Sequence, residues 1–257
     1  MHISGIGVLA CVFAAASFAA GAATVSPFDT PLKVVHIALP RDKDNPQAKR
    51  EVRCSYYPKF MVKEIDLGAE GADQLSILHN GEGRICRRVN APNEKIVSPD
   101  DWTGYFAGVS GDYVFFSADD GWNGGMGFAV FTPDAKKLFE DVEKNWTIIA
   151  AVAPPGPAGI DSGHGIGMRY TRVYGAKCSL AGAHGEACWE RIRRDTGLQG
   201  PMPDCRADYA REQARTPKSP VLDDPTAVEY DVATTIAVNG VHETAVGPAP
   251  PKCRPQE

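Results

Sequence analysis

One short segment of the chain brings together the residue types of a hydrolase active site. Asp161, Ser162 and His164 lie within four consecutive positions. A serine nucleophile needs an imidazole base within hydrogen-bond reach and an acid that orients the base. Such partners usually come from distant segments, and the chain has no Gly-x-Ser-x-Gly motif. The simpler interpretation is a glycine-rich loop held by turn hydrogen bonds, and a secreted hydrolase is the alternative function.

A second segment offers carboxylates, an amide and an aromatic ring between glycines. Asp119 and Asp120 could bind Ca2+ together with Asn123, although their spacing differs from that of an EF-hand loop. Trp122 could stack on a sugar or anchor a protein partner. The simpler interpretation is a wide hairpin turn whose Trp folds back on a sheet. We rank these four residues and Trp102 above the serine segment as a binding site for a protein or carbohydrate ligand.

Charge and metal-ligand patterns exclude several classes of function. The formal net charge of -5 gives no electrostatic footprint for nucleic acid. No two cysteines and no two histidines have the spacing of a metal site, and we expect no metal and no cofactor. Two basic clusters are interpreted as solvated surface. They are Arg84, Arg87 and Arg88 around Cys86, and Arg191, Arg193 and Arg194.

The start of the chain predicts export. Residues 3–20 contain no Asp, Glu, Lys or Arg, and Ala20-Gly21-Ala22 has the small-x-small pattern of a cleavage site. We therefore expect a signal peptide over 1–22, no stable membrane span after its cleavage, and a periplasmic or secreted mature protein. The region before the apolar run has no Lys or Arg, which leaves the true start codon open.

Cysteine arithmetic supports the same interpretation. Cleavage after Ala22 removes Cys11 and leaves an even number of cysteines, as expected for three disulfides in an oxidising compartment. We favour a Cys54–Cys86 bridge. The other two bridges then lie within the C-terminal group, whose pairing the sequence leaves open: Cys178, Cys188, Cys205 and Cys253.

The elements that must position these residues are mostly strands. Residues 50–57 and 228–238 alternate apolar and polar side chains, as strands with one buried face do. Asn239-Gly240 then predicts a type I′ turn to a strand over 241–246. Residues 186–198 and 204–215 are the helix candidates. The prediction is a mainly β (α+β) fold, a compact antiparallel domain with one or two short C-terminal helices.

Two segments limit this prediction. Residues 133–146 fit either a helix, from their apolar spacing, or the return strand of a hairpin that follows a tight turn. The segment 154–167 is rich in Pro and Gly and divides the chain into two portions. We interpret 23–257 as a single secreted domain with a long surface loop.

Overall fold

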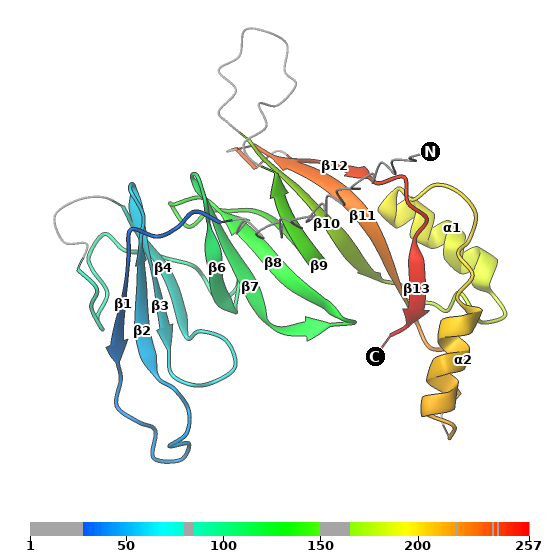
Figure 1. Cartoon of the computed structure of the whole chain (residues 1–257), viewed down its shortest axis with the longest axis horizontal. Coiled ribbons are helices and arrows are strands. Elements are labelled where there is room, and N and C mark those ends of the chain that lie inside the picture. Colours follow the sequence, from blue (N-terminus) through cyan, green and yellow to red (C-terminus); the bar gives the residue numbers. More distant parts are fainter. Residues whose placement is uncertain are drawn as a thin grey trace, which may run out of the picture.

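The computed structural model describes residues 28–79, 85–149, 165–218, 220–237, 239–240 and 242–256. The predicted signal peptide over 1–22 and most of the segment 154–167 lie outside these residues. Two antiparallel sheets, two short helices and three disulfides confirm the predicted mainly β fold (Figure 1).

The first sheet is a meander of five strands in chain order. Its strands are β1 (Lys33–Ala38), β2 (Glu51–Tyr56), β3 (Phe60–Asp66), β4 (Gln74–His79) and β5 (Lys95–Ile96). Opposite positions across β2, β3 and β4, such as Ser55, Val62 and Ile77, share one face. Both faces of this sheet are covered, so most residues of β3 and β4 are buried.

The second sheet runs in the order β12-β11-β10-β9-β8-β7-β6, with β13 also paired to β11. Its first strands are β6 (Tyr105–Ser110), β7 (Tyr113–Trp122), β8 (Gly125–Phe131), β9 (Lys137–Ile149) and β10 (Ile166–Gly175). Helices α1 (Gly185–Thr196) and α2 (Arg206–Arg215) precede β11 (Thr226–Ile236), β12 (His242–Val246) and β13 (Lys252–Pro255). The helices lie at the end of the sheet opposite to β6 (Figure 1).

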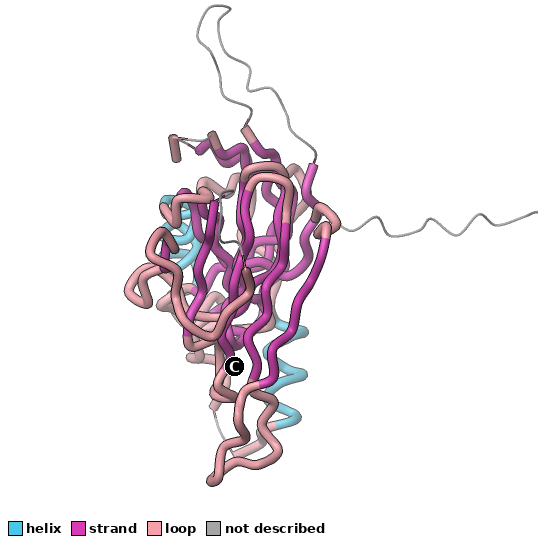
Figure 2. Tube along the Cα trace, turned by 90° about the vertical axis from the view of Figure 1, so that its left-hand side faces the viewer, coloured by secondary structure: helices cyan, strands magenta, loops and turns pink. Residues whose placement is uncertain are grey.

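The first sheet packs on only part of the second. Val62 and Ile77 of the first sheet share a core with Phe116 and Phe131 of β7 and β8. We call the face that carries these two phenylalanines the inner face of the second sheet. The opposite face, with Phe128, forms a separate core together with side chains of α1. In the view from the side, the strands of the first sheet stand nearest the viewer (Figure 2).

The ambiguous segment 133–146 contains a turn and a strand, so the helical alternative is wrong. Thr132 N donates to Lys136 O at 2.9 Å, and Ala135 has a positive φ of 60° within this turn. The β8–β9 register shifts beside Phe131, which allows Leu138 and Phe139 both to be buried. This irregularity gave the sequence its helix-like spacing of apolar residues.

The β7–β8 hairpin differs from the prediction in its turn. The expected wide loop after Ser117 is strand as far as Trp122, which pairs with Gly125. The two residues between them, Asn123 and Gly124, have φ values of 50° and 64°, as a type I′ turn requires. The β11–β12 hairpin is present, with pairs from Val232–Val246 to Ile236–His242, and residues 238 and 241 beside its predicted turn lie outside the described residues.

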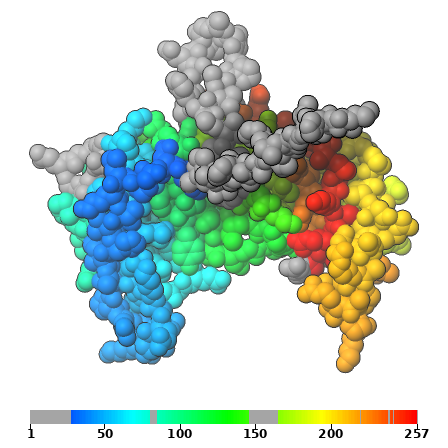
Figure 3. Space-filling model, viewed as in Figure 1, coloured from blue at the N-terminus to red at the C-terminus, as the bar shows by residue number. Residues whose placement is uncertain are grey.

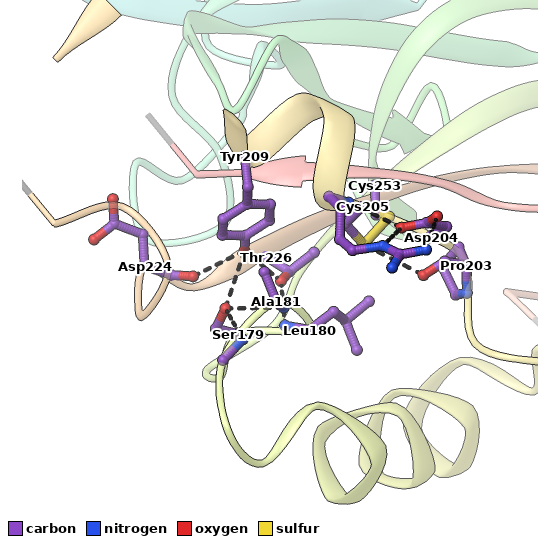
Figure 4. Close-up of a disulfide and its surroundings, with 12 residues drawn as sticks. Ser179, Leu180, Ala181, Pro203, Asp204, Cys205, Tyr209, Asp224, Thr226 and Cys253 are labelled. Carbon is purple, nitrogen blue, oxygen red and sulfur yellow. Dashed lines mark hydrogen bonds and ion pairs between the residues drawn. A yellow bond between two sulfur atoms is a disulfide. The ribbon is translucent and has the colours of Figure 1, made fainter. Parts of the chain in front are cut away.

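The disulfides have the expected distribution. Cys54–Cys86 is present, and the C-terminal group pairs as Cys178–Cys188 and Cys205–Cys253. Cys205–Cys253 joins the start of α2 to β13, as Figure 4 shows. Nearby, the buried Tyr209 hydroxyl lies 2.7 Å from Thr226 Oγ1 and donates to Asp224 O at 2.9 Å. These contacts fix α2 against β11 and β13.

Candidate functional site

The inner face of the second sheet continues beyond the first sheet. A Cβ placed on Gly125 would meet Val142 and Val173, which shows that β8, β9 and β10 share this face. Val173 lies opposite Glu229 of β11. Figure 3 shows this part of the second sheet, in green, between the blue first sheet and the orange α2. The first sheet does not cover this part among the described residues, and we call it the open inner face.

Trp122 lies on the open inner face, and 47% of its area is exposed. A Cβ on Gly175 would lie 1.8 Å from Cη2 of Trp122, so the indole rests on the glycine of β10. Gly175 pairs with Ala227 of β11, which pairs with Arg254 of β13. The exposed indole and the Arg254 side chain therefore occupy neighbouring rows of this face.

Arg254 joins the C-terminal strand to the β7–β8 hairpin. Its guanidinium donates one hydrogen bond to the carbonyl oxygen of Asn123 and another, at 3.3 Å, to Glu229 Oε1. Lys144 Nζ donates to both oxygens of Glu229, at 2.9 and 2.8 Å. The Cys205–Cys253 bridge immediately precedes Arg254 and fixes the strand that carries it.

Two cations therefore hold the carboxylate of Glu229. Burial alone would raise the pKa of Glu229, but the hydrogen bonds and charges of Lys144 and Arg254 outweigh burial and lower it. Glu229 is thus ionised at neutral pH and its oxygens are engaged. It positions the two cations and is poorly suited to act as a general base.

A groove of about 880 Å³ begins at this cluster. Lys144, Glu229 and Arg254 form part of its wall, and the 198–204 and 246–253 segments form most of the rest. A second hollow of about 590 Å³ shares residues 246–248 with it. The rigid apolar side chains of the groove include Pro201, Pro203, Pro248, Pro250 and Pro251.

The groove is lined by apolar side chains and by acids that are paired with cations. The residues that line it include no Ser, Thr or His, and Cys253 is in a disulfide. Its remaining acids form ion pairs, Asp204 with Arg206 and Asp208 with Arg211. Across the part of the chain that the structure describes, no three His, Cys, Asp or Glu side chains are placed to hold a metal ion.

The structure separates the other residues of the predicted site. Asp119 lies beside Gly71 near the first sheet, whereas Asn123 is buried at the hairpin tip. Trp102 is half-buried where the two sheets meet, and its Nε1 donates to Ser117 O at 3.3 Å. Trp102 thus serves packing, and Trp122 is the member of the predicted set on the open inner face. Asp120 is exposed on β7.

Sequence reasoning missed Arg254, Glu229 and Lys144. Glu229 lies 85 residues from Lys144 and 25 residues from Arg254 in the chain. In the sequence Glu229 has the appearance of an ordinary solvent-facing position of an alternating strand. No local spacing could therefore identify the cluster. Asp161, Ser162 and His164, the residues of the hydrolase alternative, lie outside the described residues.

Comparisons with known proteins identified no relative of this chain. No protein-family model matches the chain, and no curated protein and no solved structure matches it significantly. None of the helices among the described residues has the length and apolarity needed to cross a bilayer.

Proposed function

We propose that this chain is an exported, non-catalytic binding protein whose ligand occupies the open inner face of the second sheet. The observation that carries the proposal is the exposed Trp122 beside a large groove whose lining includes no Ser, Thr or His. Three disulfides and the predicted signal peptide support an oxidising compartment, periplasmic or extracellular.

The chemistry of the groove favours an extended peptide of a partner protein. Five prolines together with Leu198, Met202 and Val246 give it apolar walls. A saccharide would need many polar side chains around its hydroxyl groups, and most charged groups here are already engaged by one another. Lys252 is exposed at the groove and forms no ion pair among the described residues. A peptide with apolar side chains and one nearby carboxylate fits this lining.

Selection from a random-peptide library displayed on phage tests the proposal. We expect enriched peptides to carry apolar residues and an acid, and to bind the Trp122→Ala and Met202→Asp variants at least tenfold more weakly than the unchanged protein. Trp122 supplies exposed apolar area, and Met202 lines the groove. The matched control is Leu222→Ala, because Leu222 is 58% exposed and lies outside the groove.

Three results would contradict the proposal. One is an absence of enriched peptides, and another is equal binding of the peptides to all three variants. The third is a glycan array that yields a ligand sensitive to Trp122 when the peptide library yields none, because the ligand would then be a saccharide.

A further inference from the structure

The outer face of the first sheet, which points away from the second sheet, carries an unexplained cluster of cations and apolar side chains. Ile85, Val89 and Ile96 are 60%, 68% and 48% exposed. Arg87 and Arg88 lie between the first two and are exposed. We call these five residues, together with Lys33, the outer patch. Figure 2 looks on to this end of the molecule.

The patch occupies one face of the sheet. Lys33 lies opposite Tyr56, whose hydroxyl accepts a hydrogen bond from Cys86 N at 2.9 Å. Ile96 lies opposite Ser76, and Ser76 lies opposite the buried Lys63. Residues opposite one another in antiparallel strands share a face, so the patch extends from β1 to β5.

The segment that carries the patch is fixed from beneath. Cys86 is bonded to Cys54 of β2. Lys63 Nζ donates to Val89 O at 3.3 Å and to Asn90 Oδ1 at 3.0 Å, and it pairs with Glu94 at 2.6 Å. These anchors hold the backbone on both sides of Arg87 and Arg88. The apolar side chains are therefore presented to the outside on a rigid support.

The charge of the patch has one sign. Lys33, Arg87 and Arg88 form no ion pair among the described residues, whereas the whole chain has a net charge of -5. Glu94, the acid of the 85–96 segment, has a side chain only 1% exposed and is neutralised by Lys63. The exposed part of the patch is thus cationic and apolar, the combination that binds an anionic lipid surface.

We propose that the outer patch docks the protein on an anionic lipid bilayer, with the cations at the headgroup phosphates and Ile85, Val89 and Ile96 at the acyl boundary. A bilayer is favoured over a soluble polyanion because exposed isoleucine and valine gain nothing from a hydrated polymer. The proposal is independent of the peptide groove, which is lined by residues of β11 and β13. These strands lie at the end of the second sheet away from the first sheet (Figure 1).

Cosedimentation with phosphatidylglycerol vesicles at low salt tests the proposal, with phosphatidylcholine vesicles for comparison. We expect the unchanged protein to bind the anionic vesicles preferentially and to dissociate as salt rises. Each cation near an anionic surface contributes about fivefold, so Arg87→Gln/Arg88→Gln should bind about 25-fold more weakly. Ile85→Gln/Val89→Gln should lower binding about tenfold.

Matched variants control for charge and apolarity. Arg191→Gln/Arg194→Gln removes the same charge from exposed positions of α1, and Leu222→Gln removes an exposed apolar side chain elsewhere. Both should bind vesicles as the unchanged protein does. Arg88 donates to Ala38 O at 2.9 Å, so Arg87→Gln alone, with an expected fivefold loss, serves if the double variant unfolds.

Four outcomes would contradict docking of the outer patch on a bilayer. No binding to phosphatidylglycerol vesicles, equal loss in the α1 variant, or equal binding to phosphatidylcholine would each overturn the proposal. So would binding to soluble heparin without binding to vesicles, because the partner would then be a polyanion.

Discussion

The guanidinium of Arg254 donates a hydrogen bond to the carbonyl oxygen of Asn123, across 131 positions of the chain. This contact joins the last strand to the tip of the β7–β8 hairpin, where Trp122 is exposed. Glu229 accepts hydrogen bonds from both Arg254 and Lys144, so Lys144 of β9 is connected to this contact. Three charged side chains of the groove, Lys144, Glu229 and Arg254, therefore belong to one connected network.

The Glu229 carboxylate should stabilise the fold in a pH-dependent way. Glu229→Gln removes the charge that holds two cations, and we expect a loss of about 2 kcal/mol in the free energy of unfolding at pH 7. Because the folded-state pKa lies below the ordinary value of 4.5, this stabilisation is present above about pH 4.5 and is lost as pH falls through the folded pKa. The difference between the two proteins in urea unfolding should therefore shrink as the pH falls below about 4.5. Glu243→Gln, at an exposed position of β12, is the control and should show no such dependence.

The packing of the Trp122 indole on β10 should require a glycine at position 175. Gly175→Ala places a methyl group where the ring lies, and we expect a loss of about 1–3 kcal/mol together with a change in tryptophan fluorescence. The cost should vanish in a Trp122→Ala background, because the ring is then absent. A cost that persists in the double variant would show that Gly175 serves the backbone and not the indole.

The two C-terminal disulfides should differ in their contribution to stability. Cys205–Cys253 spans 48 positions and Cys178–Cys188 spans 10. Loop-closure entropy predicts losses of about 4 and about 2.7 kcal/mol when each pair is replaced by Ala. Hydrogen exchange should quicken in β13 and the 198–204 segment for the first replacement. Equal losses from the two replacements would contradict this account.

The stability of the fold should depend strongly on both partners of the buried Lys63–Glu94 pair beneath the outer patch. Lys63→Met leaves the Glu94 carboxylate buried without its cation, and we expect a loss of about 3–5 kcal/mol in urea unfolding. Lys63→Met/Glu94→Leu should recover much of it, because neither charge is then buried. The control is Lys59→Met, which breaks an exposed pair with Asp112 and should cost less than about 1 kcal/mol.

Strand positions and the disulfide framework were predictable because they follow from local alternation and from the grouping of cysteines. The geometry of the turns was harder to predict from the sequence. The stretch that ends at Asn123-Gly124 has the composition of a wide loop, yet its φ values are those of a type I′ turn between paired strands. Pairing with the neighbouring strands decided the turn geometry, and no short window contains that information.

The binding face was only partly predictable. The exposed Trp122 could be found from its place in a polar, glycine-rich stretch, whereas Trp102 occurs in a similar context and packs between the sheets. The difference depends on which half of the second sheet the first sheet covers. That coverage is a tertiary relationship, as is the meeting of Glu229 with its two cations.

The second sheet is wider than the first, and this difference separates the groove from the first sheet. From β6, at the edge beside the first sheet, to β11, beside the groove, there are five strand spacings of about 4.8 Å, or about 24 Å. The Debye length at physiological salt is only about 8 Å. The field of an anionic bilayer against the first sheet would therefore be largely screened at the groove, and the affinity of a charged peptide there should not depend on whether the protein is bound to a membrane.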